Sequence, residues 1–246
     1  MRKEMSMWKK VSWSFAYGIG MALLEAIVVV YLRELYYPQG FAFPLKNMDW
    51  NITMIEILRE AGTILMLVCV SALAAENFYT WVGFFLFNFA VWDIFYYVWL
   101  KVLLNWPANF LEWDILFLIP ITWDGPVIAP LLCSVAMLAL AGVIFYFHQH
   151  KVRVSFTAKE WGLFVSGSLL VFTSFIWNYT HFMIDGGYFK DLANLGNNSQ
   201  FIEAVENFLP PSFQWGFFLP GYGLIVGGIV LLALRLGKNL KTGRAG

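Results

Sequence analysis

The chain has 246 residues, of which 60% are hydrophobic and only 13% are charged, about half the charged share of an ordinary soluble domain. Its 16 basic and 16 acidic residues cancel, so charge gives no reason to expect nucleic acid or an acidic partner. The two cysteines lie in apolar runs, and the sequence has no C-x-x-C or Cys/His cluster. This pattern argues against a disulfide framework and against a structural zinc site.

Six apolar runs have the length of about 20 residues that a membrane-spanning helix needs. In chain order they cover residues 11–32, 52–75, 78–104, 125–148, 161–184 and 213–236. The first run exceeds the roughly 7–15 apolar residues of a signal peptide, so we count it as a span. We therefore expect an all-α, polytopic transmembrane helix bundle that forms a single integral membrane domain over residues 1–246.

Two connecting segments have features of their own. Residues 110–122 are apolar but too short to cross a bilayer, and Pro120 would interrupt a helix there. This segment predicts a re-entrant or interfacial piece. The long loop of residues 185–211 contains Ser199 as a candidate N-cap of a short amphipathic helix, which the Pro-Pro pair at its end would stop.

Basic residues indicate the orientation of the chain. Eleven of the 16 lie in three places: Arg2, Lys3, Lys9 and Lys10; Lys151, Arg153 and Lys159; and Arg235, Lys238, Lys241 and Arg244. With six spans, all three places fall on the same side of the membrane. Since loops rich in Lys and Arg face the cytoplasm, both termini are expected inside, an N-in/C-in arrangement.

Ionisable side chains within the spans gather toward the predicted outer side. A rise of about 1.5 Å per residue places Glu25, Glu60 and Tyr97 roughly 10–12 Å below the outer boundary. On the same scale Asp93 lies roughly 16 Å deep. A charge at the bilayer centre costs about 2.5–3.5 kcal/mol, so these groups must be paired or solvated. The sequence predicts a polar pocket in the outer half of the bilayer, formed by Glu25, Glu56, Arg59, Glu60, Asp93, Tyr97, Asp114, Asn178 and His181.

The dipeptide Trp-Asp occurs three times, at residues 92–93, 113–114 and 123–124. Irregular backbone at membrane depth is tolerated only where it is buried in protein or lines a water-filled cavity. We therefore expect the three pairs to mark the walls and rim of one outward-facing pocket, with residues 110–122 as its roof.

Each of these residues also has a structural interpretation. The charged cluster that opens the second span fits the start of an interfacial helix. Glu25 and Asp93 fit a hydrogen bond or an ion pair between helices. Asp114 and Asp124 fit turn caps, and His181 fits an interfacial helix end.

Four segments in the first 130 residues carry a resemblance to known sequences: EAIVVVYLRE, IEILREAGTILML, VWDIFYYVWLKVLLNWP and WDILFLIPITWDGPVIAP. They resemble a family of bacterial multi-span membrane proteins that has no assigned activity. The resemblance implies a multi-pass protein of the bacterial cytoplasmic (inner) membrane, and it implies no activity and no functional residue.

Two functions fit the predicted pocket, and a third stays open. The first is an intramembrane enzyme acting on a lipophilic substrate, with Glu25, Glu60 and Asp93 as catalytic acid/base groups. In its metal-dependent form these three, with Glu56 and His181, bind a divalent transition metal. The second is a proton- or cation-coupled transporter or channel, whose weakness is the apolar inner half of the spans. The third is an accessory subunit whose charges pair with a partner subunit. The dry inner half favours the enzyme.

Overall fold

Six long helices carry the apolar runs that the sequence predicts as membrane spans. The structure, a computed structural model, describes residues 5–46 and 48–242. The long helices are α1 (Met7–Tyr36), α2 (Trp50–Ala74), α3 (Phe78–Leu104), α4 (Ile128–Gln149), α5 (Ala158–Asp185) and α7 (Trp215–Lys241). All six are long and apolar enough to cross a membrane, so the predicted polytopic all-α bundle is confirmed.

Capping side chains explain where the helices begin. Helix α5 starts at Ala158, three residues before the expected position, because Thr157 and Glu160 form a capping box. In that box the Glu160 carboxylate accepts a hydrogen bond from the Thr157 N–H at 2.7 Å. Helix α3 starts at Phe78, as expected, and Asn77 closes a box of the same type. Such polar residues set the helix ends within otherwise uniform apolar sequence.

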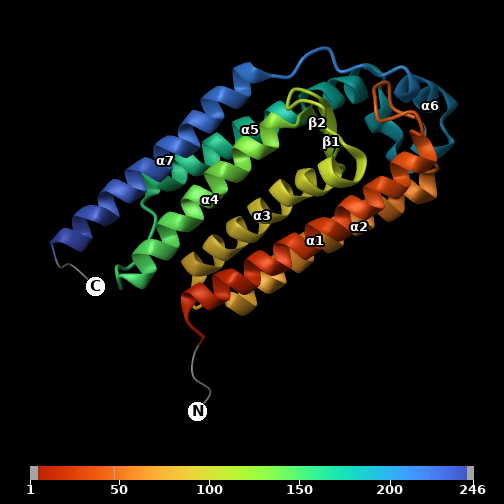
Figure 1. The fold of residues 1–246 in the computed structure, drawn as a ribbon. Helices are drawn as coiled ribbons and strands as arrows, with labels where there is room; N and C mark the ends of the chain where they lie inside the picture. Colours follow the sequence, from red (N-terminus) through yellow and green to blue (C-terminus); the bar gives the residue numbers. More distant parts are fainter. Residues whose placement is uncertain (1–4, 47, 243–246) are drawn as a thin grey trace.

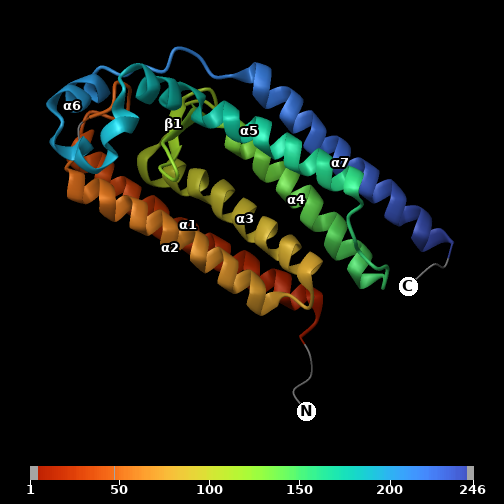
Figure 2. The same ribbon diagram turned by 180° about the vertical axis from the view of Figure 1, so that it is seen from behind.

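The helices form two groups that meet along α3 and α4. Helix α3 packs against α1 on one side and against α4 on the other, while α5 packs along α7. Figures 1 and 2 show α1 to α3 on one side of the bundle and α4, α5 and α7 on the other. Both ends of the described chain lie at the same end of the bundle, as an even number of spans requires (Figure 1). The side of the membrane that this end faces stays a prediction from the basic residues.

Two glycines bring α5 and α7 into close contact. A Cβ atom at Gly167 would lie 2.7 Å from the Gly221 carbonyl oxygen, and one at Gly221 would lie 2.8 Å from the Gly167 carbonyl oxygen. Backbone approach of this kind is typical of membrane helices, whose association depends on packing rather than on the hydrophobic effect.

Apolar side chains fill the end of the bundle that carries the chain ends. Phe84 of α3, Ile144 of α4 and Leu232 and Leu236 of α7 are fully buried in one cluster. The charged side chains Glu25, Arg33, Glu56, Arg59, Glu60 and Asp93 of α1 to α3 lie toward the opposite end.

The short segment between α3 and α4 is a β-hairpin. Strand β1 (Trp113–Phe117) pairs antiparallel with β2 (Trp123–Pro126), and Asp114 faces Gly125 across the ladder. The hairpin packs against α5 and α4 through β2, and Phe117 contacts Trp92 of α3. The predicted segment 110–122 thus contains β1 and the turn of a hairpin that β2 completes, and both figures show the hairpin at the end of the bundle away from the chain ends.

The long connection between α5 and α7 contains a 3₁₀ segment, η1 (Tyr188–Asn197), and a short helix, α6 (Ser199–Glu206). The N-cap of α6 is Asn198, whose side-chain oxygen accepts hydrogen bonds from the N–H groups of Gln200 and Phe201. The predicted cap at Ser199 was wrong by one residue, because Asn is at least as good an N-cap as Ser.

Candidate functional site

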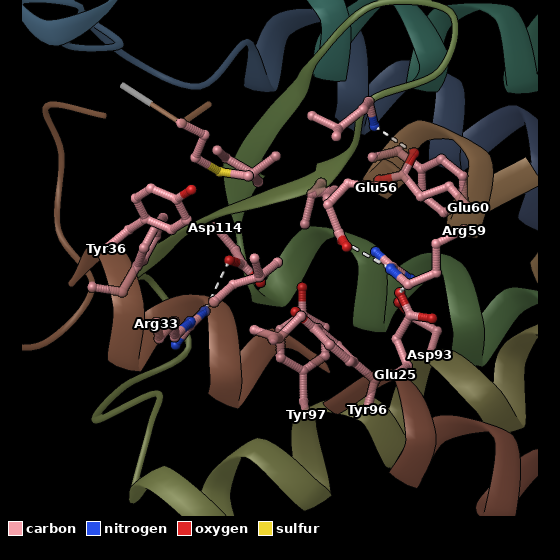
Figure 3. Close-up of a pocket in the computed structure, with 18 of the residues that line it drawn as sticks. Glu25, Arg33, Tyr36, Glu56, Arg59, Glu60, Asp93, Tyr96, Tyr97 and Asp114 are labelled. Carbon is pink, nitrogen blue, oxygen red and sulfur yellow. Dashed lines mark hydrogen bonds and ion pairs between the residues drawn. The ribbon is translucent and has the colours of Figure 1, made fainter. Parts of the chain in front are cut away.

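A cavity of about 150 Å³ lies at the end of the bundle away from the chain ends. We call it the outer pocket; α1, α2, α3, the hairpin and the loop after α1 form its walls. Figure 3 shows its charged side chains converging from these elements. Seven of the nine predicted pocket residues line it: Glu25, Glu56, Arg59, Glu60, Asp93, Tyr97 and Asp114.

Arg59 binds two carboxylates of the outer pocket. Its Nε donates to Glu56 Oε2 at 2.8 Å, and its Nη1 forms an ion pair with Glu25 Oε1. The Thr63 hydroxyl donates to the other Glu25 oxygen at 3.3 Å. The Arg59 guanidinium on α2 thus pairs with one carboxylate from α1 and one from α2. For Glu25 the geometry matches the structural interpretation, an ion pair between helices.

A second ion pair joins α1 to the hairpin. Arg33 Nη2 lies 3.2 Å from Asp114 Oδ1, and the two residues are only 7% and 3% exposed. The guanidinium also lies over the rings of Phe41 and Trp106, at 4.6 and 3.9 Å from their centroids. Burial raises the pKa of Asp114 to about 6, although the positive charge of Arg33 opposes this rise. The pair fixes the hairpin over the pocket.

Glu60 and Asp93 differ from the other carboxyl groups of the pocket. Glu60 Oε2 accepts a hydrogen bond from the Leu118 N–H at 2.8 Å, and Asp93 Oδ2 accepts one from the Ser134 hydroxyl at 2.7 Å. Within residues 5–46 and 48–242, neither forms an ion pair with a Lys, Arg or His. Each carboxyl is therefore oriented by a neutral donor and has no fixed counter-charge.

The third Trp-Asp pair lies outside the outer pocket, contrary to expectation. Asp124 is 1% exposed and accepts a hydrogen bond from Asn178 Nδ2 on α5 at 3.4 Å. Asn178 also donates to the Ser212 carbonyl at 3.2 Å. Burial raises the pKa of Asp124 to about 7, partly offset by the Asn178 hydrogen bond. Successive strand residues point to opposite faces, so the hairpin turns its two aspartates toward different helices.

His181 and Asn178 lie beside a different cavity, of about 560 Å³, between α5 and the connection that follows it. The His181 ring packs on Trp177, and its Nδ1 lies 2.9 Å from the Trp177 carbonyl oxygen. Their assignment to the pocket was therefore wrong: on α5 they face the other half of the bundle. No group of three or more His, Cys, Asp or Glu side chains in the described chain is arranged to hold a metal ion. The predicted metal set of Glu25, Glu56, Glu60, Asp93 and His181 is not brought together.

Several pocket residues were missed from the sequence. Arg33 and Tyr36 follow Glu25, Val29 and Leu32 at helical spacing, so the face of α1 that carries Glu25 could have identified them. The contributions of the Leu118 N–H and the Ser134 hydroxyl had no such pattern. They depend on how the hairpin and α4 fold back onto α2 and α3.

Comparisons with family models, with curated proteins and with solved structures found no match to this chain.

Proposed function

We propose that the protein is an enzyme of the bacterial inner membrane in which Glu60 and Asp93 act as general acid and base on a lipophilic substrate held in the outer pocket. The observation that carries this proposal is the contrast among the pocket carboxyl groups. Glu25, Glu56 and Asp114 are in ion pairs, whereas Glu60 and Asp93 are held only by neutral donors.

That contrast matters for proton transfer. An ion-paired carboxylate must break its pair to take up a proton, while a carboxyl held by a neutral hydrogen bond can change charge and keep its position. General acid/base catalysis needs such groups at a fixed distance from the reacting atom. The Leu118 N–H and the Ser134 hydroxyl supply this orientation from the hairpin and from α4.

The remaining charged groups form a rigid frame around the proposed catalytic pair. Arg59 is adjacent to Glu60 in the chain and is held by Glu56 and Glu25. Aromatic side chains, including Trp92, Tyr96 and Phe117, supply apolar walls. Polar groups that converge in a largely apolar cavity are typical of small-molecule sites.

The test uses purified protein reconstituted in nanodiscs and incubated with a total bacterial lipid extract, followed by untargeted mass spectrometry of the lipids. Glu60→Gln and Asp93→Asn preserve side-chain shape, and Glu203→Gln, on exposed α6, is the matched control. We expect the wild type and the control to convert at least one lipid. Because acid/base groups contribute roughly 10²–10⁴-fold to a rate, each pocket variant is expected to lose about 100-fold or more. A folded wild type that converts no lipid, or conversion that neither pocket variant slows, contradicts the proposal.

A proton- or cation-coupled transporter is the second candidate, and buried Asn88 favours it. Asn88 lies five residues before Asp93 on α3, about 7.5 Å nearer the chain ends, and its Nδ2 donates to the Ser71 hydroxyl at 3.0 Å. Its Oδ1 has no hydrogen-bond partner among the described residues. Asn88 thus extends the polar side chains of the pocket by one position toward the apolar cluster around Phe84. Proton flux into liposomes that Asp93→Asn and Asn88→Leu both abolish would favour transport.

A further inference from the structure

We propose that the outer pocket recognises an amphiphile whose head group carries a protonated primary amine, with Asp114 as the group that binds the amine. The inference rests on the proposed function, because it names the substrate class of the same pocket. It concerns the ground-state ligand, however, and does not require that Glu60 and Asp93 catalyse a reaction.

The charge distribution of the outer pocket favours a cationic ligand. Five carboxyl groups and two guanidinium groups line the outer pocket. Both guanidinium groups are already engaged: Arg59 with Glu56 and Glu25, and Arg33 with Asp114 and two aromatic rings. An anionic head group such as a phosphate would have to displace one of these carboxylates. A cation meets two carboxyl groups that have no ion pair in the described chain, Glu60 and Asp93, and the second oxygen of Asp114, whose Oδ1 is paired with Arg33.

Two buried polar atoms supply the second argument. Asp114 Oδ2 and Trp92 Nε1 are buried and have no hydrogen-bond partner within residues 5–46 and 48–242. Both residues line the outer pocket, and Figure 3 shows the Asp114 carboxylate among the side chains that converge there. The Tyr97 hydroxyl lies beside the Asp114 carboxyl as a neutral donor, so Oδ2 lacks a well-aligned hydrogen bond rather than any polar neighbour.

Buried polar atoms in folded proteins are nearly always hydrogen-bonded, so these two indicate what the ligand supplies. Asp114 Oδ2 is an acceptor and calls for an N–H or O–H donor. Trp92 Nε1–H is a donor only and calls for an oxygen acceptor. A primary ammonium group provides a charged donor, which a quaternary ammonium group lacks. An ester, hydroxyl or phosphate oxygen of the same head group provides the acceptor.

The walls and size of the pocket fit this head group. Trp92, Tyr96 and Tyr97 line the cavity, and an aromatic ring attracts a cation that lies over its face. A cavity of about 150 Å³ is smaller than the roughly 300–1,000 Å³ of sites that enclose a whole drug-sized ligand. It takes a head group of a few heavy atoms and leaves an alkyl tail outside. Leu58 of α2 and Leu35 of α1 are highly exposed apolar residues on the two helices beside it.

The test compares ligands that share one tail. Dodecylamine, dodecanol and dodecyl phosphate are titrated into the purified full chain at about pH 7.5, and dissociation constants are measured by calorimetry. Free ethanolamine, which has no tail, distinguishes a water-soluble amine from a membrane amphiphile. Nanodiscs of phosphatidylethanolamine and of phosphatidylglycerol supply the lipid form. We expect dodecylamine to bind at least about tenfold more tightly than the other tailed ligands, because only it offers a charge-assisted hydrogen bond.

Three variants assign the contacts. Asp114→Asn is expected to weaken dodecylamine binding about tenfold or more, and Trp92→Phe, which removes the indole N–H together with part of the ring, to weaken binding of the phosphatidylethanolamine head group severalfold. Glu203→Gln should change neither. If Asp114→Asn does not fold, the ligand series on the wild type and the Trp92→Phe variant still decide the question. Equal affinity for all three tailed ligands, or tighter binding of dodecyl phosphate, would overturn the proposal.

The outcomes separate this inference from the proposed function. Selective amine binding without lipid conversion would keep the ligand class and remove the catalytic role of Glu60 and Asp93. Conversion of a lipid without an amine, together with no preference for dodecylamine, would keep the enzyme and remove the ligand class.

Discussion

The buried carboxyl of Asp124 should make the stability of the protein depend on pH in a defined window. Asp124 is 1% exposed, forms no ion pair in the described chain, and has a pKa raised by burial from its ordinary value of 3.8 to about 7. A carboxyl whose pKa is higher in the folded than in the unfolded state favours the fold when protonated. Its contribution is therefore complete below about pH 4 and is lost as the pH rises toward about 7.

The size of the effect follows from the shift. Each pH unit within the window changes the free energy of unfolding by about 1.36 kcal/mol for one such group. Between pH 5 and pH 7 the wild type should therefore lose roughly 2–3 kcal/mol through Asp124. Above about pH 8, one unit beyond the pKa in the folded state, this contribution is constant. Asp124→Asn mimics the protonated acid and retains an oxygen that can accept a hydrogen bond from Asn178. The pH-dependent contribution of residue 124 to the free energy of unfolding should therefore be absent in this variant.

The assay is denaturant unfolding of the detergent-solubilised protein at pH 5, 6, 7 and 8, for the wild type and for Asp124→Asn. Subtracting the two curves removes the pH dependence of all other groups that the substitution does not affect. Glu203→Gln, on exposed α6, controls for a change of net charge. A difference curve that is flat between pH 5 and pH 7, or that rises with pH, would refute the reasoning.

Three further substitutions test the packing and the ion pairs. Arg235 binds both oxygens of fully buried Glu160, each at 2.9 Å. Arg235→Lys cannot form the two parallel hydrogen bonds, so it should lower the free energy of unfolding by roughly 1–3 kcal/mol, measured by chemical unfolding. An unchanged unfolding midpoint would contradict this account. Gly167→Leu should separate α5 from α7 and lower the melting temperature. The control Gly162→Leu, whose added Cβ meets nothing within 4 Å, should leave the melting temperature unchanged. Equal effects of the two substitutions would argue against the close contact. Arg59→Gln leaves the carboxylates of Glu25 and Glu56 without their shared counter-charge. It should destabilise the fold by about 3–5 kcal/mol in the same unfolding assay. A loss below about 1 kcal/mol would show that these carboxylates are solvated.

Composition and run length were enough to predict the six spans. A bilayer forces every span to satisfy its backbone internally over a fixed length, so apolar runs of about 20 residues translate directly into helices. The boundaries were less predictable, since a local capping box such as that of Thr157 and Glu160 decides them.

Depth along each helix was enough to bring together most of the pocket. Glu25, Glu60 and Asp93 come from three helices, yet a rise of about 1.5 Å per residue placed them in nearby layers. Depth does not determine which way a helix face points, and His181 on α5 was misplaced for that reason. The role of Leu118 was beyond sequence reasoning, because a backbone N–H has no residue signature.

The hairpin explains why aspartates stand in the most apolar part of the chain. Asp114 faces Gly125 in the ladder, and Asp124 pairs with the neighbouring Ile115, so the two carboxyl groups point to opposite faces. One face reaches Arg33 of α1, and the other reaches Asn178 of α5. The hairpin thus ties together the two helix groups at the end where they are not packed directly by the apolar cluster.

This connection has a consequence for the outer pocket. The same strand that carries Asp114 leads to Leu118, whose N–H orients Glu60. A ligand that binds Asp114 would therefore act on the strand that positions Glu60. Since Asp124 of the other strand is hydrogen-bonded to Asn178 of α5, we expect such a displacement to fall mainly on β1 and the turn that follows it. Binding of a cationic head group at Asp114 and orientation of the carboxyl of Glu60 are, on this geometry, coupled through five residues of chain.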